Sequence, residues 1–164
     1  MLIEPAIAVL ASTPEVMRSM LASLPDELVA APDSDGWSAR DVVAHLASRQ
    51  EPAIVGRVRA ILDRPGGPIP DVPASLMNRE PFRARPFDVL LAEFAAGRAE
   101  AVALLDELTP EQMSWRGTHS GLGELSISEV IHHVAYHDLV HIAQAAHLAA
   151  RPLEELRGGM RRFR

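Results

Sequence analysis

Histidines are concentrated in one short stretch of the sequence. Five of the seven histidines fall between Ile131 and Leu148, although histidine is neither a strong helix former nor a common core residue. His137 and His141 are four residues apart, a spacing that on a helix places two side chains on the same face, one turn apart. Two imidazoles in this arrangement can bind one metal ion together.

The residues around this pair indicate that it faces the core of a helix bundle. Apolar residues recur with it at spacings of three, four and seven, the pattern of an amphipathic helix: Ile127, Val130, Ile131, Val134, Ala145 and Leu148. A third histidine, His45, lies among apolar neighbours in Val42–Leu46 of another predicted helix. Packed helix axes lie about 8–10 Å apart, a distance that opposed imidazoles and one ion can fill.

Three histidines without any cysteine predict a metal site of the open kind. Because the chain has no Cys, a zinc site must use histidine or carboxylate ligands. Three imidazoles leave a fourth position for water, as in catalytic zinc sites, and nickel or another late first-row ion suits the same ligands. We expect one divalent ion, zinc or nickel, at His45, His137 and His141. The alternative interpretation is that His137 and His141 are buried packing residues held by hydrogen bonds.

The remaining histidines of this stretch are less suited to be metal ligands. His133 lies one turn before His137 and could be a fourth ligand, although a place at the rim of the site suits it better. His132 and His147 project from other faces of the same predicted helix. We expect both of these to be surface residues.

Other polar and aromatic residues could assist a metal site. Asp138 and Glu51 are the candidate catalytic bases, and each could equally have a structural or surface role. Gln144, three residues after a predicted ligand, could hydrogen-bond that ligand or line the pocket. Trp37 and Trp115 could form walls of a pocket, but we expect them to pack against the core.

Composition favours a helical framework for these residues. Hydrophobic residues make up 48% of the chain and aromatic residues only 4%. The core must therefore be built from Ala, Leu, Val, Ile and Met, a mixture that suits packed helices better than a sheet. At 164 residues the chain is long enough for one domain and short for two. We expect a single all-α domain over residues 1–164.

The first half of the chain predicts two of four main helices. The first runs near 13–24, where Thr13-Pro14-Glu15 resembles an N-cap followed by proline at the first helical position. The apolar segment Ile3–Ala11 forms a short helix before it or extends it. The second helix covers about 38–62 after a capping-box start, and Pro52 should kink it.

The second half predicts a long connection and two further helices. Residues 64–85 are rich in proline and glycine and form a crossover without regular structure. The third helix covers 86–108 and is broken only by a glycine. After a single turn near 109–111 and a loop at 117–123, a second capping box opens the fourth helix at 127–150. Four helices with a long connection between the second and third predict a four-helix bundle with a crossover.

Charge and composition exclude several classes of function. The net charge is -6 and no basic tract is present, so we expect no nucleic-acid partner. No apolar run approaches the roughly 20 residues of a membrane span, and Met1–Pro5 lacks the basic start of a signal peptide, which predicts a cytoplasmic protein without a membrane partner. All basic residues are Arg, so neither a cysteine nor a lysine nucleophile is available.

Three stretches of the sequence resemble motifs of the DinB family of damage-inducible-protein-like four-helix bundles, in particular its broad DinB-like subgroup. They are Gly36–Leu46, Thr118–Ser126 and Tyr136–Gln144. The resemblance covers nearly the whole chain with the motifs in the right order. It implies a bundle with a long connection between helices two and three, frequent homodimers, and a three-histidine metal site at His45, His137 and His141.

The resemblance narrows the function without giving a substrate. Similar members include metal-dependent transferases that attach low-molecular-weight thiols such as bacillithiol to electrophiles. Mycothiol-dependent maleylpyruvate isomerases share the fold but tend to carry Glu where this chain has His137, which disfavours that activity. We expect a divalent-metal-dependent enzyme for a small-molecule substrate, either a thiol S-transferase with a low-molecular-weight thiol cosubstrate or a metal-activated hydrolase. The alternatives are a non-enzymatic metal-binding stress-response or interaction module, and a structural bundle with an empty site.

Overall fold

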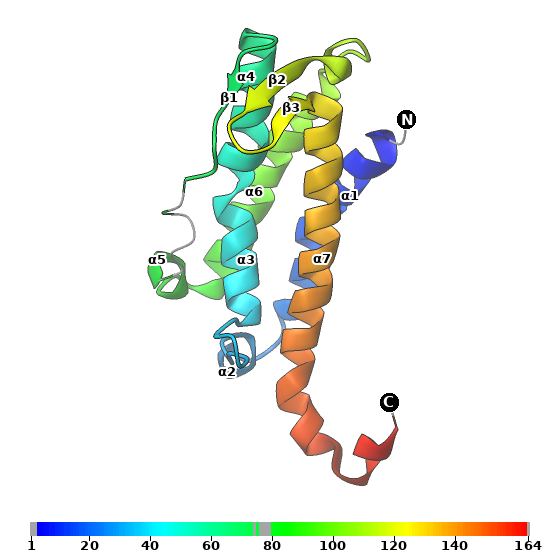
Figure 1. The fold of residues 1–164 in the computed structure, drawn as a ribbon. Helices are drawn as coiled ribbons and strands as arrows, with labels where there is room; N and C mark the ends of the chain where they lie inside the picture. Colours follow the sequence, from blue (N-terminus) through cyan, green and yellow to red (C-terminus); the bar gives the residue numbers. More distant parts are fainter. Residues whose placement is uncertain (1–2, 74, 76–79, 164) are drawn as a thin grey trace.

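Four long helical segments packed side by side form the body of the molecule (Figure 1). The computed structural model describes residues 3–73, 75 and 80–163. The four segments are α1 (Ile3–Leu21), the continuous run of α3 (Ala39–Ser48), η1 (Gln50–Val55) and α4 (Gly56–Asp63), α6 (Phe87–Asp106), and α7 (Ile127–Glu154). Helix α1 packs against α6 and α7, and α3 packs against the same two helices. The predicted four-helix bundle, with its long connection between the second and third helices, is confirmed.

Helix α1 begins at Ile3, so of the two alternatives for Ile3–Ala11 the extension of the first helix is the one observed. Pro14 lies inside the helix and does not start it, so the predicted N-cap at Thr13 is wrong. Because proline has no N–H, the carbonyl of Leu10, four residues earlier, loses its partner within the helix. Nη1 of Arg98 on α6 donates to this carbonyl at 3.0 Å instead. A side chain from a neighbouring helix therefore compensates for the proline, and Ile3–Ala11 is the first half of α1.

The second segment changes its helix type near Pro52. Helix α3 ends at Ser48, and the next turn, η1, is a π-helix from which Gly56 donates its N–H to the carbonyl of Glu51. The missing N–H of Pro52 disfavours the ordinary α-helical ladder at this point, and the wider turn accommodates it. The kink predicted at Pro52 is therefore a π-helical turn, a feature that occurs frequently at functional sites.

Capping boxes fix the starts of the two helices that carry the histidine triad. At the start of α3, the Asp41 N–H donates to Ser38 Oγ at 3.2 Å and the Ser38 N–H donates to Asp41 Oδ2 at 2.9 Å. At the start of α7, Glu129 and Ser126 exchange the same pair of bonds at 3.1 and 2.7 Å. Both predicted capping boxes are present. Each one fixes the first residue of its helix, and therefore the direction in which the side chains of that helix project.

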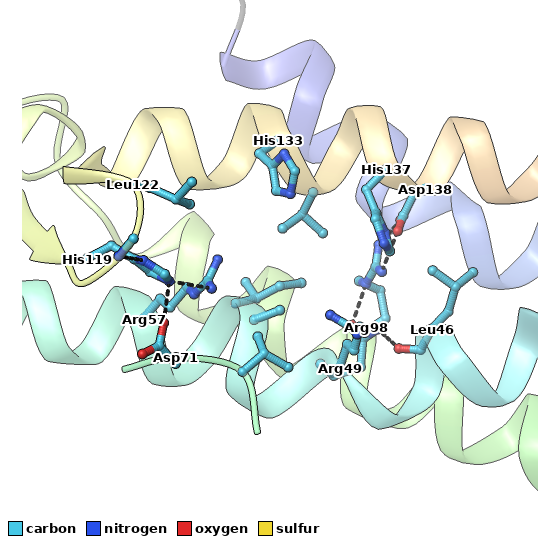
Figure 2. A pocket seen from close by; sticks show the side chains of 16 residues that line it. Leu46, Arg49, Arg57, Asp71, Arg98, His119, Leu122, His133, His137 and Asp138 are labelled. Carbon is cyan, nitrogen blue, oxygen red and sulfur yellow. Dashed lines mark hydrogen bonds and ion pairs between the residues drawn. The ribbon is translucent and has the colours of Figure 1, made fainter. Parts of the chain in front are cut away.

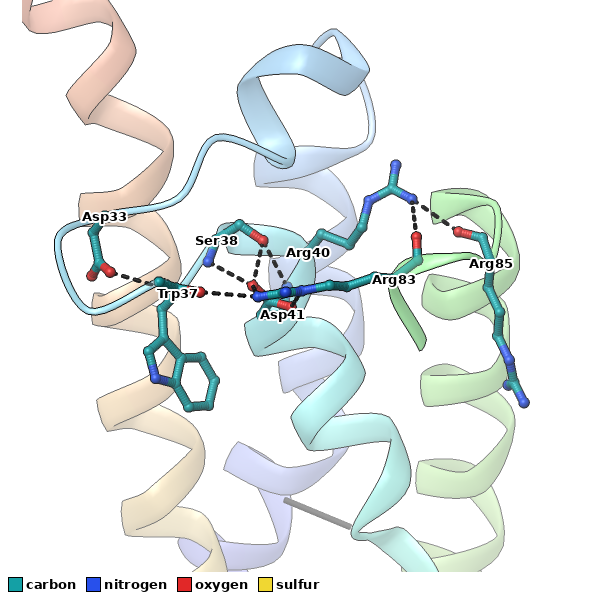
Figure 3. Close-up of polar contacts among 8 residues, drawn as sticks. Asp33, Trp37, Ser38, Arg40, Asp41, Arg83 and Arg85 are labelled. Atoms are coloured by element: carbon teal, nitrogen blue, oxygen red, sulfur yellow. Dashed lines mark hydrogen bonds and ion pairs between the residues drawn. The ribbon is translucent and has the colours of Figure 1, made fainter. Parts of the chain in front are cut away.

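The end of the crossover is fastened to the beginning of α3. Arg83 donates from Nε to Asp41 Oδ1 at 2.8 Å, and Arg40 donates from Nη1 to the carbonyl of Arg85 at 2.9 Å (Figure 3). Burial alone would raise the pKa of Asp41, but hydrogen bonds from Arg83 and Ser38 outweigh it and hold that pKa below its usual value. The carboxylate is therefore ionised, and it ties the crossover to α3.

Short elements complete the described part of the chain, and some of them were not predicted. They are α2 (Asp26–Val29), β1 (Pro68–Ile69), α5 (Glu80–Arg83), η3 (Gln112–Ser114), β2 (Arg116–His119), β3 (Gly123–Ser126) and η4 (Glu155–Arg162). Strand β1 pairs with β2 in parallel, and β2 pairs with β3 as an antiparallel hairpin. The expectation of irregular structure at 64–85 and a loop at 117–123 is therefore wrong in part, because strands of two to four residues are too short to show alternation. Residues 74 and 76–79 of the crossover lie outside the described residues.

A polar layer divides the apolar core in two along the length of the bundle. One cluster contains Leu46 on α3 and Ala145 on α7, and the other contains Ile54 on η1 and Ala135 on α7. His137, His141 and the buried polar side chains Gln50 and Asp138 lie in the segments between these residues, and His45 directly precedes Leu46. Among the described residues, no helix has both the length and the apolar character needed to cross a membrane.

Candidate metal centre

The structure brings the three predicted ligands together from two helices. His45 on α3 lies opposite His137 and His141 on α7. The Nε2 atoms of His45 and His137 are 3.3 Å apart, and those of His137 and His141 are 3.2 Å apart. One ligand atom from each of the three residues lies within 4.8 Å of the others. A tetrahedral ion with bonds of ~2.0–2.1 Å holds its ligand nitrogens roughly 3.3 Å apart, so the spacing of the imidazoles fits one ion.

Hydrogen bonds among the three histidines cannot account for both of the short contacts between their Nε2 atoms. Nδ1 of His141 lies 2.7 Å from Oε1 of Gln144 and donates its hydrogen there, so Nε2 of a neutral His141 carries a lone pair. Nε2 of His137 contacts both neighbours, but one hydrogen can lie along only one of the two contacts. The other contact then joins two nitrogens with no hydrogen between them. A cation between the three Nε2 atoms resolves this arrangement, whereas the interpretation as packing histidines leaves it unresolved.

Two of the histidines are held in the neutral form that binds metals. The pKa of His137 is lowered to about 4, by burial first and then by the charges of His141, Arg49, His133 and Arg98. Burial also lowers the pKa of His141, although the hydrogen bond to Gln144 and the charge of Asp138 act in the opposite direction. Both imidazoles therefore offer a lone pair at neutral pH without first losing a proton.

Trp37 covers one side of the triad. Its ring meets the His45 ring edge-on at a centroid distance of 5.7 Å and stacks on the His141 ring at 6.5 Å. The backbone N–H of Trp37 donates to Asp33 Oδ1 at 2.8 Å, which fixes the loop before α3 (Figure 3). Trp37 also packs against the apolar core. It therefore packs as expected and forms a wall of the site as well.

Asp138 has a partner that the sequence did not reveal. Its side chain is fully buried and forms an ion pair with Arg98, itself 1% exposed. Arg98 also donates from Nε to Gln50 Oε1 at 2.6 Å. The carboxylate is thus occupied by a guanidinium and binds no ligand imidazole. This geometry argues against Asp138 as a catalytic base and gives it a structural role.

The remaining candidates lie at different distances from the triad. Glu51 is exposed and lines a separate surface hollow, so it is not placed to act as a base at the triad. The ring centroid of His133 is 6.2 Å from that of His137, and His133 is an exposed residue that also lines the neighbouring cavity. Nδ1 of His132 is 2.7 Å from the carbonyl of Ser128 on its own helix, and His147 is exposed.

A cavity of about 380 Å³ opens beside His137 (Figure 2). Its polar lining includes Arg49, Arg57, Asp71 and His119, none of which the sequence singled out for the site. The two arginines are eight residues apart, and a π-helical turn that no periodicity predicts lies between them. Asp71 and His119 come from the crossover and the hairpin. Only the resemblance of residues 118–126 to a family motif pointed to that region.

Comparisons with known proteins agree with this architecture. The model of the DinB superfamily matches residues 10–145. The solved structure of YfiT from Bacillus subtilis, described as a probable metal-dependent hydrolase with an unusual four-helix bundle topology, aligns with a TM-score of 0.81. The alignment covers 91% of this chain and 86% of YfiT at 21% sequence identity. None of the curated proteins compared with the chain matches it. At this identity, the likeness to YfiT shows a common fold.

Proposed function

Because this chain belongs to the DinB superfamily, we propose that it is a divalent-metal-dependent enzyme with His45, His137 and His141 as the metal ligands. The observation that carries the proposal is the convergence of three imidazole nitrogens, with two Nε2 contacts of 3.3 and 3.2 Å. That spacing matches a single tetrahedral ion with its fourth position open. Zinc and nickel are the ions that we assign to it, because imidazole ligands suit both.

The proposed reaction is nucleophilic attack on a small-molecule substrate. An ion with an open position lowers the pKa of a coordinated water or thiol and so supplies a nucleophile near neutral pH. The chain has no Cys or Lys that could serve instead. Hydrolysis is supported by the description of YfiT as a probable metal-dependent hydrolase. S-transfer would use the same site with a low-molecular-weight thiol in place of water.

The side chains around the triad prepare it for this reaction. Gln144 orients His141 through the Nδ1 hydrogen, which directs Nε2 toward the other two histidines. Trp37 packs against the rings of His45 and His141 and so covers the triad on one side. The cavity beside His137 provides the open side, where a substrate can approach.

Metal analysis of purified variants tests the ligand assignment. The wild-type protein should carry close to one divalent ion per chain, and His141→Ala should lose it because two imidazoles hold an ion far more weakly than three. The matched control is His147→Ala, which removes an exposed histidine of the same helix and should retain the ion. Full occupancy in His141→Ala would contradict the assignment.

Activity is tested with metal-loaded and metal-stripped protein side by side. A panel of esters and amides probes hydrolysis, and a panel of thiols with electrophiles probes S-transfer. Turnover should need the metal in either case. A stripped preparation that turns over a substrate as fast as the loaded one would refute the mechanism. Bound metal without turnover on either panel would favour the non-enzymatic metal-binding module instead.

A further inference from the structure

We propose that the cavity beside His137 binds the carboxylate group of a small organic acid through Arg57 and Arg49. The inference deepens the proposed function, because it gives the chemical class of the molecule presented to the triad, and it rests on that function for this role. It is carried by the charge of the cavity wall and by the hydrogen-bonding state of Arg57.

The charges that line the cavity leave an excess of cation. Three arginines and two aspartates belong to the lining, in a chain whose net charge is -6. Arg98 and Asp138 neutralise each other in their buried ion pair. Asp71 is 62% exposed at the side chain and is engaged by His119. Outside that ion pair the lining therefore holds two arginines, Arg49 and Arg57, and one aspartate, and a metal at the triad would add further positive charge. An anion balances this wall better than a neutral molecule does.

Arg57 has hydrogen atoms that no acceptor takes up. The residue is 9% exposed, and its Nε is buried without a hydrogen-bond partner among the described residues. Its Nη2 lies 3.2 Å from Nε2 of His119 (Figure 2). The Gly121 N–H donates to Nδ1 of the same ring, so Nε2 carries the ring hydrogen and donates it to Asp71 at 3.0 Å. Nε2 therefore has no lone pair for Arg57, so the Nη2 hydrogens of Arg57 remain available to a ligand in the cavity.

Arg49 places a second positive charge between Arg57 and the triad. Burial first, and then the positive charge of Arg57, lower the pKa of Arg49, as expected for two guanidinium groups in the wall of one cavity. Arg49 and His137 line the same cavity, so the guanidinium group lies on the side of the cavity next to the proposed metal ligands (Figure 2). A carboxylate bound to both arginines would relieve their repulsion and would lie on the side of the cavity that leads to the triad.

The rest of the wall indicates what the carboxylate is attached to. The apolar lining includes Ala53, Ile54, Leu122 and Val134. A cavity of about 380 Å³ is in the size range of small-molecule sites. One excess charge and apolar walls suit a monoanion with a short hydrocarbon body. A phosphate dianion would need more donors and would leave the apolar surface uncovered.

Binding of hexanoate and of its neutral analogue hexanamide tests the inference. Isothermal titration of the wild-type protein should show hexanoate binding about ten- to hundredfold more tightly, the usual effect of charge-assisted hydrogen bonds. Arg57→Gln should remove this preference. The matched control is Arg59→Gln, which changes an exposed arginine of the same helix and should preserve it. Arg49→Gln should also weaken hexanoate, and it serves as the test if circular dichroism shows that Arg57→Gln does not fold.

The same titrations in metal-stripped protein separate this inference from the proposed function. A preference for hexanoate that persists without metal and disappears in Arg57→Gln supports the carboxylate site, even if no metal-dependent activity exists. Equal binding of acid and amide overturns the inference. So does a preference that needs metal but survives Arg57→Gln, because hexanoate would then be a metal ligand only, and the proposed function would stand. Inorganic phosphate should compete poorly with hexanoate. If phosphate binds the cavity more tightly than hexanoate does, the carboxylate assignment is overturned.

Discussion

Asp138→Asn should destabilise the protein strongly, because it leaves the buried charge of Arg98 without its counterion. Asparagine has nearly the shape of aspartate, so the variant changes charge and hydrogen bonding but little volume. Arg98 is 1% exposed and Asp138 is 0% exposed, so water cannot replace the lost carboxylate. The structure provides no other acidic side chain for Arg98 among the described hydrogen bonds and ion pairs.

The expected size of the effect follows from the burial of the pair. Removing one partner of a buried ion pair costs about 3–5 kcal/mol, against a total stability of roughly 5–15 kcal/mol for a typical domain. With a urea dependence of about 2 kcal/mol per M, the midpoint of unfolding should fall by about 2 M. The matched control is Glu100→Gln, which removes an exposed carboxylate from α6, the helix of Arg98. Its effect should stay within about 0.5 kcal/mol.

A double variant separates the ion pair from the other bonds of Arg98. Asp138→Leu combined with Arg98→Met removes both charges, and such replacements are often neutral or stabilising. Here the carbonyl of Leu10 loses its donor and Pro14 cannot replace it, so the double variant should still lose about 1–3 kcal/mol. Urea unfolding followed by circular dichroism measures all of these variants. If Asp138→Asn is as stable as Glu100→Gln while losing activity, Asp138 is a catalytic base and its ion pair with Arg98 does not stabilise the fold.

Two further properties can be tested on the purified protein. The pKa of His137 in the folded protein is about 4, against an ordinary value of 6.5. Between these pH values the unfolded chain binds more protons than the folded protein does. Metal-free protein should therefore be fully stable above pH 6.5 and lose stability as the pH falls toward 4. Allowing for partial exposure, the loss from pH 7 to pH 5 should be about 1 kcal/mol in urea titrations; an equal loss in His137→Gln would contradict this origin. We also predict a homodimer, since Tyr136, Leu139 and Val140 form an exposed apolar face on α7, and light scattering that shows a monomer at every micromolar concentration tested would refute it.

The helical framework could be predicted because its signals are local. The capping boxes at Ser38 and Ser126 and the apolar stripe of α7 are patterns that span only a few residues, and the structure follows them. The N-cap predicted at Thr13 was wrong because the missing N–H of Pro14 is compensated by Arg98, which lies 88 residues beyond Leu10 in the chain. A contact over that separation leaves no mark on the local sequence pattern.

The convergence of the histidines could also be predicted, whereas the cavity could not. His137 and His141 share a face through helical spacing alone, and His45 lies on a neighbouring amphipathic helix. Arg49 and Arg57 reach one cavity only because a π-helical turn lies between them. The break in pattern at Gly97 has a similar tertiary reason, since a Cβ there would lie 3.1 Å from the side chain of Gln50.

The bonds of Arg98 have a consequence for how the protein opens. Its guanidinium donates to Leu10 on α1, to Gln50 on η1 and to Asp138 on α7, while its own backbone belongs to α6. All four segments of the bundle therefore meet at one side chain. Withdrawing any one of them leaves a buried donor or acceptor unsatisfied in the others, a cost of about 1–3 kcal/mol or more for a charged group. Partial unfolding of a single helix is thereby disfavoured, and slowly exchanging amides in all four segments should exchange together, as one cooperative unit.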